Sequence, residues 1–416
     1  MAITSRDELA RLVRTAVTQV EVTDVHTHLY PPSFGNLLLW GIDDLITYHY
    51  LVAEVFRFAD VSYDAFWRMS KRDQADLIWR HLFQDNSPYG EACRGVLTTL
   101  QSLGLDVQSR DLASYRRYFD GTTVEEYVDT VFEAARINRV VMTNDPFDPA
   151  ERRCWLGGFQ PDPRFRAALR LDQLLNSWDQ AWPRLQEWGY GVGEDLTGAT
   201  LDQVRRFLAE WADRMQPVYL AASLPPTFAF PEDSARGALI RECVLPLCEQ
   251  LNRPFAMMIG VEKRVNPALR DAGDAVGKAD IHAVERLCAD HPKNKFLVTM
   301  LARENQHELC VAARKFRNLL IFGCWWFLNN PSLVEEITRM RCELLGLGFL
   351  PQHSDARVLD QLIYKWRHSR KIIGDVLCDK YADLAAAGWA PTEPEIRRDV
   401  ANLFGGNFWS FVERNM

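Results

Sequence analysis

Eight short apolar segments, separated by amphipathic helical patterns, are the feature that most constrains the fold of this chain. Most of them are continuously apolar, which is typical of strands buried on both faces. Strand–helix repetition counted to eight predicts the α/β class, as a (β/α)8 barrel of the TIM type. The predicted strands are Val20–His28, Arg139–Asn144, Phe165–Leu171, Val218–Leu224, Phe255–Ile259, Phe296–Leu301, Leu319–Trp325 and Gly348–Pro351, the last leading into His353-Ser354-Asp355.

The alternation is broken once, by residues 30–137, which contain several helical patterns and no clear strand. One helix is predicted over 123–137, where Thr123 and Glu126 form a capping box. A segment this long inside a compact domain is usually functional or a subdomain. We therefore predict one barrel domain over residues 1–416, with a helical insertion after its first strand that lids the carboxyl end of the barrel.

Composition limits the classes of binding partner and the cellular compartment that we expect for this protein. The net charge of −8, without an offsetting basic cluster, argues against a nucleic-acid groove. No apolar run reaches the ~20 residues that span a bilayer, and the N-terminus is charged where a signal peptide needs an apolar core. Nine scattered cysteines are typical of reduced thiols. We expect a cytoplasmic protein with a small-molecule substrate and no nucleic-acid or membrane partner, and a homo-oligomer stays open.

Two histidines stand on alternate positions in Asp24-Val25-His26-Thr27-His28-Leu29, directly after an apolar run. Residues i and i+2 of a strand point to the same side, so both rings aim at one point where a divalent cation could lie. The alternative is a pair of histidines on a polar strand face.

Barrel active sites form at the carboxyl ends of the strands, and the first and eighth strands are neighbours in a closed barrel. His26 and His28 can therefore converge with Asp355. Two histidines and a carboxylate suit Zn²⁺ and leave a coordination position open for substrate. Asp355 could instead pair with Arg357 in a buried salt bridge.

Other candidates follow from the same rule. Arg357 can bind a carboxylate through two parallel hydrogen bonds, and Arg170 ends the third strand unless it bridges Asp172. Trp325 and Trp326 end the seventh strand; adjacent aromatic residues are usually core, but sugar rings also stack on indoles.

A further pair of candidates lies early in the insertion. His49 and Tyr50 are residue types that could supply acid–base chemistry from a lid, although ordinary structural roles are as well supported.

Three motifs together resemble the uronate (glucuronate) isomerase family of the amidohydrolase superfamily. They are the His-x-His motif, Gly323-Cys324-Trp325-Trp326-Phe327 and Ser354-Asp355-Ala356-Arg357. The His-x-His motif alone would identify only the superfamily. The resemblance extends over essentially the whole chain, including the insertion and Asn407-Phe408-Trp409.

The resemblance implies an aldose–ketose isomerase that interconverts D-glucuronate with D-fructuronate and D-galacturonate with D-tagaturonate. It implies one divalent metal ion, with zinc expected, held by His26, His28 and Asp355. Arg170 and Arg357 would bind oxygens of the sugar acid, with His49 and Tyr50 reaching in from the insertion.

The chemistry gives these residues roles. The cyclic sugar must open, and Asp355 suits the base at the ring hydroxyl. A proton then moves from C2 to C1 through a cis-enediolate, for which we assign Tyr50 as the proton shuttle and Arg357 as the partner of the developing oxyanion.

The chain departs from commoner family members in two places. They carry an apolar-His-Ile-Gly stretch where this chain has Met257-Met258-Ile259-Gly260, and Asp-His-Tyr-Lys-Trp-Arg where it has Thr47-Tyr48-His49-Tyr50-Leu51. Roles attached to those residues elsewhere do not carry over, so the reaction type is better defined than the preferred uronate.

Two alternative functions compete with the isomerase. A metal-dependent hydrolase of the amidohydrolase type could act on a sugar-acid derivative, but most binuclear members need a bridging lysine and later histidines, and no histidine ends a middle strand here. A non-catalytic sugar-acid binder is disfavoured because the candidate metal ligands and Arg357 are all retained.

Overall fold

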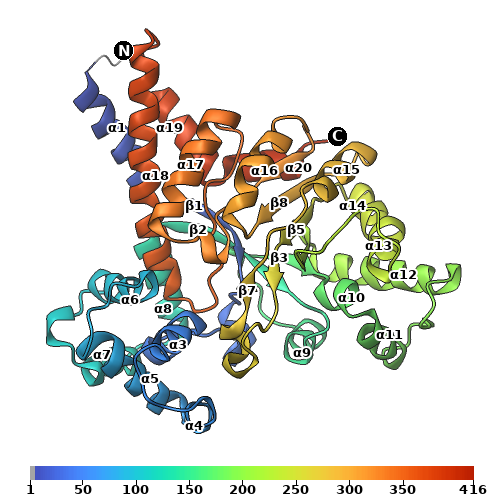
Figure 1. The fold of residues 1–416 in the computed structure, drawn as a ribbon, viewed down its shortest axis with the longest axis horizontal. Coiled ribbons are helices and arrows are strands. Elements are labelled where there is room, and N and C mark those ends of the chain that lie inside the picture. Colours follow the sequence, from blue (N-terminus) through green and yellow to red (C-terminus); the bar gives the residue numbers. More distant parts are fainter. Residues whose placement is uncertain (1–4) are drawn as a thin grey trace.

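The computed structural model describes residues 5–416, and a parallel sheet lies at its centre (Figure 1). Seven strands are hydrogen-bonded in the order β1-β2-β3-β4-β5-β8-β9, and every pairing is parallel. Their bounds are β1 Val22–Thr27, β2 Ile137–Asn144, β3 Phe165–Arg170, β4 Leu220–Leu224, β5 Phe255–Ile259, β8 Phe296–Met300 and β9 Leu319–Ile321. A two-residue antiparallel pair, β6 Val261–Glu262 and β7 Ala275–Val276, was not predicted.

The eighth predicted strand is an extended segment rather than a strand, and it closes the barrel. Leu350 bridges Phe322 at the end of β9, while on the other side Asp355 N–H donates to the carbonyl of His26 at 3.1 Å. The N–H of His28 donates to the Ala356 carbonyl at 2.7 Å. Asp355 has φ of +52°, in the left-handed region, which interrupts a regular ladder. The predicted barrel class is confirmed, with an irregular last member.

Side chains along each strand point alternately into the barrel and out toward the helices, so the strands line two hydrophobic cores. Residues such as Val141, Ala221, Met258 and Leu320 face the barrel interior, while their sequence neighbours face the helices. Helix α20 (Asn407–Glu413) contributes Phe408 and Phe411 to the interior cluster.

Helices surround the barrel. The longest, α18 (Gln361–Ala386), follows the closing segment and packs against α1 (Arg6–Gln19), beside which it lies at the upper left of Figure 1. The others outside the insertion are α9 Pro149–Gly157, α10 Asp172–Asn176, α11 Trp178–Glu187, α12 Gly198–Met215, α13 Ala235–Leu239, α14 Leu245–Leu251, α15 His282–Asp290, α16 Gln306–Ala313, α17 Pro331–Leu345 and α19 Glu393–Ala401.

Between β1 and β2 the chain is helical. The helices are α2 Ile42–Ile46, α3 His49–Val55, α4 Tyr63–Arg68, α5 Lys71–Trp79, α6 Glu91–Ser102, α7 Leu112–Asp120 and α8 Val124–Ala135, and most gather at the lower left of Figure 1. The predicted capping box starts α8, where the Thr123 side chain accepts from Glu126 N–H and the Glu126 carboxylate accepts from Thr123 N–H. The lid role of residues 30–137 stays a prediction.

Two further observations concern the described chain. Within residues 5–416, no helix is both long and apolar enough to cross a membrane. The nine cysteines are all free thiols.

Candidate active site

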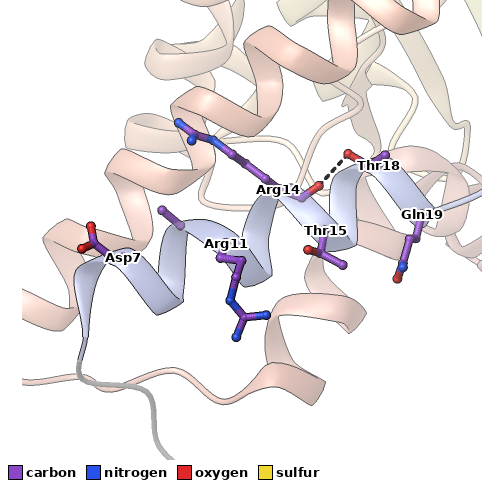
Figure 2. Close-up of a pocket in the computed structure, with 7 residues that line it drawn as sticks. Asp7, Arg11, Arg14, Thr15, Thr18 and Gln19 are labelled. Atoms are coloured by element: carbon purple, nitrogen blue, oxygen red, sulfur yellow. Dashed lines mark hydrogen bonds between the residues drawn. The ribbon is translucent and has the colours of Figure 1, made fainter.

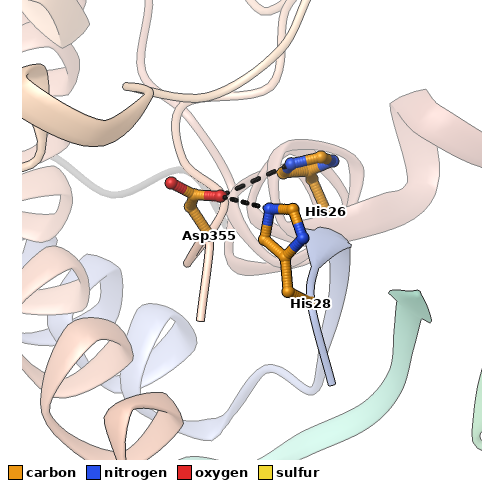
Figure 3. Close-up of side chains that lie close together, drawn as sticks. All are labelled: His26, His28 and Asp355. Atoms are coloured by element: carbon orange, nitrogen blue, oxygen red, sulfur yellow. Dashed lines mark ion pairs between the residues drawn. The ribbon is translucent and has the colours of Figure 1, made fainter. Parts of the chain in front are cut away.

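The predicted metal ligands meet at the mouth of the barrel (Figure 3). His26 lies on β1 and His28 one residue beyond its end, and both direct Nε2 at Oδ1 of Asp355, at 3.4 and 3.3 Å. One ligand atom from each residue lies within 4.8 Å of the other two. The first strand and the closing segment therefore bring together the two histidines and the carboxylate as the sequence predicted.

Tyr219 fixes which ring nitrogen of His26 carries the proton. Its hydroxyl group donates its single hydrogen to the carbonyl of Val25 at 2.8 Å, so it accepts a hydrogen bond from Nδ1–H of His26 at 3.3 Å. Nε2 of His26 is then left with a lone pair. Metal-binding histidines commonly donate their other ring N–H in this way.

The burial of these atoms tests whether a metal ion fits. Nε2 of His26 and Oδ1 of Asp355 are buried and make no hydrogen bond within residues 5–416. Two facing acceptors repel each other unless a cation lies between them. A nitrogen–nitrogen–oxygen donor set of this kind fits a divalent metal ion such as Zn²⁺.

The ionisation of His28 suits the same role. Burial, followed by the nearby Arg357 guanidinium, lowers the pKa of His28 to about 3. Its imidazole is therefore neutral at ordinary pH, which is the form that binds metal ions.

Eight predicted residues line one inner cavity of about 20 Å³. They are His26, His28, His49, Arg170, Trp325, Trp326, Asp355 and Arg357. The sequence did not point to the other four lining residues, Ser223, Met258, Val261 and Lys263. Ser223 could have been found as a polar residue near the end of β4, whereas nothing in the sequence distinguishes Lys263.

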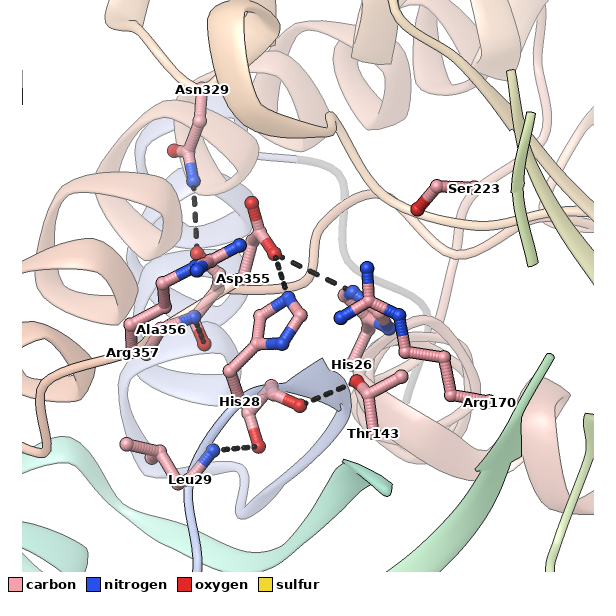
Figure 4. Close-up of polar contacts among 12 residues, drawn as sticks. His26, His28, Leu29, Thr143, Arg170, Ser223, Asn329, Asp355, Ala356 and Arg357 are labelled. Carbon is pink, nitrogen blue, oxygen red and sulfur yellow. Dashed lines mark hydrogen bonds and ion pairs between the residues drawn. The ribbon is translucent and has the colours of Figure 1, made fainter. Parts of the chain in front are cut away.

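Both arginines line the inner cavity (Figure 4), but they differ in their hydrogen-bond partners. Arg170 pairs with both carboxylate oxygens of Asp172, at 2.8 and 3.0 Å, so the bridging alternative is realised although the side chain still lines the cavity. The Arg357 guanidinium makes no hydrogen bond or ion pair with any described residue, and the alternative Asp355–Arg357 salt bridge does not form. Arg357 therefore keeps all its donors available for a ligand.

The insertion delivers His49 to the cavity through the start of α3. The rings of His49 and Tyr50 lie 4.5 Å apart, and the His49 ring lies 5.6 Å from that of Trp326. Tyr50 does not line the cavity, although its hydroxyl is buried and has no hydrogen-bond partner among the described residues. Burial, helped by the nearby Arg357, lowers the pKa of His49 well below its usual value, and burial raises that of Tyr50 well above 10.

His353 is a buried neighbour that the sequence placed at the eighth strand end without a role. Its ring lies 5.2 Å from that of His26, and neither ring nitrogen has a partner among the described residues. A Cβ on Gly323, whose φ is +68°, would come within 1.9 Å of His353 Nδ1. The glycine of the Gly-x-Trp-Trp-Phe motif is therefore needed for this ring to fit.

A second, outer cavity of about 530 Å³ adjoins the inner one, since Arg170, Ser223, Val261 and Lys263 line both. Its other walls carry side-chain amides from Gln173, Asn176 and Gln180. Amides and charged groups of this kind suit a ligand rich in hydroxyl groups.

A separate hollow of about 590 Å³ lies along α1, beside Arg11 and Arg14 (Figure 2). All its lining residues come from that one helix, and none belongs to the cluster of predicted site residues. It carries no arrangement that points to catalysis.

The fold and the site together define the class: an α/β-barrel enzyme with a candidate metal site of two histidines and a carboxylate at the carboxyl ends of its strands. A solved uronate isomerase from Bacillus halodurans C-125 is 63% identical to the chain, with a TM-score of 0.98 over 100% of this chain and 98% of that one. The chain belongs to the uronate isomerase family.

More distant structures share the fold. A uronate isomerase from Thermotoga maritima matches with a TM-score of 0.78 at 14% identity, over 99% of this chain and 100% of that one. A glucuronate isomerase from Caulobacter crescentus matches with a TM-score of 0.75 at 15% identity, over 99% of this chain and 95% of that one. No family model and no curated protein matches the chain.

Proposed function

We propose that the chain interconverts D-glucuronate with D-fructuronate, and D-galacturonate with D-tagaturonate. One observation carries the proposal: the convergence of His26, His28 and Asp355 beside an unpaired Arg357, in a member of the uronate isomerase family. Each of these side chains is a residue type that the reaction requires.

His26, His28 and Asp355 would hold one divalent ion, and zinc is the metal that two imidazoles and a carboxylate favour. Once bound, such an ion would supply positive charge to hold the carboxylate and a neighbouring hydroxyl of the sugar acid. The inner cavity of about 20 Å³ has room for about one water molecule. The bound sugar acid must therefore extend toward the outer cavity that shares Arg170 and Ser223.

Ring opening requires a base at the anomeric hydroxyl group. The Asp355 carboxylate lines the inner cavity and makes no ion pair with an arginine among the described residues. We assign it to take the proton from that hydroxyl. A proton must also reach the ring oxygen, so that the C1–O5 bond breaks and the aldehyde forms.

The isomerisation step moves a proton from C2 to C1. We assign Tyr50 as the group that takes and returns this proton, next to His49. Burial raises the pKa of Tyr50, so the phenol carries its proton in the free protein and must pass that proton to another group before it can accept one from C2. The free Arg357 guanidinium donates hydrogen bonds to the oxygens that become negative in the cis-enediolate.

The test is an assay of metal-loaded protein with each uronate separately, following ketose formation by NMR. We expect product from at least one of the two substrates and one bound metal ion per chain. Absence of product from both would overturn the proposal. Two bound ions per chain would favour a hydrolase.

A further inference from the structure

We propose that Asp24 and Lys365 are positioning residues that hold the backbone on both sides of Ser354 and thereby aim Asp355 at the two histidines. Neither residue lines the cavity or reaches the predicted metal position. Apart from the bond that Asp24 accepts from the Trp366 indole, their side-chain hydrogen bonds go to the backbone of Ser354 and His26.

Asp24 accepts a hydrogen bond from the backbone N–H of Ser354. The carboxylate is fully buried, and its Oδ1 accepts from Ser354 N–H at 3.0 Å. Its Oδ2 accepts from the indole N–H of Trp366 at 2.8 Å. One carboxylate on β1 thus ties the closing segment to α18, two residues before the ligand His26.

Lys365 donates a hydrogen bond to the backbone carbonyl of Ser354. Its side chain is 3% exposed, and Nζ donates to the Ser354 carbonyl at 2.5 Å. The amide of Asn329 donates to the same carbonyl at 3.4 Å (Figure 4). The N–H of this same peptide group, that of Asp355, donates to the His26 carbonyl at 3.1 Å. The peptide that precedes Asp355 is therefore fixed at both of its polar ends.

Asp355 needs such a constraint because of its backbone conformation. A residue other than glycine with φ near +50° is less stable by roughly 1–2 kcal/mol and persists only where its surroundings define it. This conformation directs the carboxylate at His26 and His28.

The consequence is that loss of either contact should loosen Asp355 before it unfolds the barrel. Removal of a group that orients a metal ligand typically weakens metal binding about 10- to 100-fold. The variants are Lys365→Met, Asp24→Asn, which keeps one carbonyl acceptor, and Trp366→Phe, which removes a single donor to Asp24 while retaining an aromatic ring.

Lys295→Met is the matched control. Lys295 is also a buried lysine, 2% exposed, whose Nζ donates to the carbonyls of Asn252, Val412 and Arg414 at 2.8, 2.6 and 2.9 Å. Within residues 5–416 it makes no hydrogen bond or ion pair with a residue of the candidate active site. Its replacement removes the same kind of interaction away from Asp355.

The experiment measures Zn²⁺ affinity by chelator competition and the visible absorption of the Co²⁺-loaded protein, with thermal unfolding of each metal-free variant. We expect about 10- to 100-fold weaker binding and a changed spectrum for Lys365→Met, a smaller loss for Asp24→Asn and Trp366→Phe, and wild-type affinity for Lys295→Met. If Lys365→Met does not fold, Trp366→Phe decides the question.

Wild-type affinity in the folded variants, or an equal loss in Lys295→Met, would overturn the inference. The inference rests on the proposed metal centre but not on the isomerase reaction. Failure of the wild-type protein to bind any divalent ion would remove the metal centre itself, whereas unchanged affinity in the variants would remove only the role of Asp24 and Lys365.

Discussion

The hydroxyl group of Tyr219 lies 3.3 Å from Nδ1 of His26 and accepts a hydrogen bond from its N–H, so a phenol directly before β4 determines the tautomer of a histidine on β1. The other ring nitrogen is then an acceptor facing Asp355. In the metal-free protein His26 therefore already has the tautomer that a metal ligand requires. This tautomer depends on Tyr219, a residue far away in the sequence.

Tyr219→Phe should weaken metal binding by about 10-fold, because the Nδ1–H of His26 loses its acceptor and the ring its fixed orientation. Chelator competition measures the effect. Tyr381→Phe is the control, since it removes a hydroxyl that donates to Asp399 at 2.9 Å between α18 and α19. Equal metal affinity in Tyr219→Phe and the wild type would show that the tautomer is set by other contacts.

Arg357→Met should lower kcat by about 100- to 1000-fold, the usual effect of removing a donor to a developing oxyanion. Because the guanidinium has no protein partner among the described residues, its loss leaves no buried group unpaired. Urea unfolding should therefore show little change in stability. Loss of stability with retained kcat would reverse the assignment.

Arg170→Met should behave differently from Arg357→Met. It leaves the carboxylate of Asp172 without its bidentate partner, so unfolding free energy should fall by roughly 3 kcal/mol, together with weaker substrate binding. The double variant Arg170→Met/Asp172→Asn should recover much of the stability and none of the binding. Recovery of both would mean that Arg170 is purely structural.

Tyr50→Phe should abolish exchange of the substrate C2 proton with solvent while metal content stays unchanged. The reason is that the phenol is the assigned shuttle and makes no hydrogen bond with a predicted metal ligand. Deuterium incorporation from D₂O, followed by NMR, measures the exchange. Exchange at the wild-type rate would assign the shuttle to another group.

Stability should also depend on pH through Glu151, a buried carboxyl that accepts from Tyr30, Asn144 and the N–H of Asp145. Burial raises its pKa from 4.5 to about 7. The folded state therefore binds the proton more tightly, so this contribution is fully present below pH 4.5 and is lost as pH rises through 7.

Glu151→Gln should make the decline of unfolding free energy between pH 5 and 7 shallower, by up to about 1.4 kcal/mol for each pH unit. Urea titrations of both proteins at several pH values measure the slope. Identical slopes would show that Glu151 does not titrate in this range.

Much of the architecture was accessible from sequence because the barrel strands are continuous apolar runs. The closing segment was the exception: Asp355 adopts a left-handed conformation that is stabilised by Asp24 and Lys365, and no local pattern reveals such distant contacts. The pair β6 and β7 escaped prediction because two residues cannot display a periodicity.

Some features of the candidate site could also be predicted from the sequence, and others could not. His26, His28 and Asp355 could be brought together because strand order alone makes the two ends of the barrel neighbours. The sequence offered the pairing of Arg170 with Asp172 as an alternative but could not decide it. That choice, and the position of Tyr50 outside the cavity, depend on side-chain directions that residue spacing does not give.

The join between β1 and the closing segment has a thermodynamic consequence. Two backbone hydrogen bonds connect these segments there, from Asp355 to His26 and from His28 to Ala356, and the proposed ligands sit on both sides of the join. An ion bound by His26, His28 and Asp355 would cross-link two parts of the chain that are more than 300 positions apart in the sequence. Each tenfold excess of free ion over its dissociation constant would then add about 1.4 kcal/mol to the stability of the closed barrel. Ion binding and folding would then be thermodynamically linked. A protein without its ion would be inactive and would also have a lower free energy of unfolding.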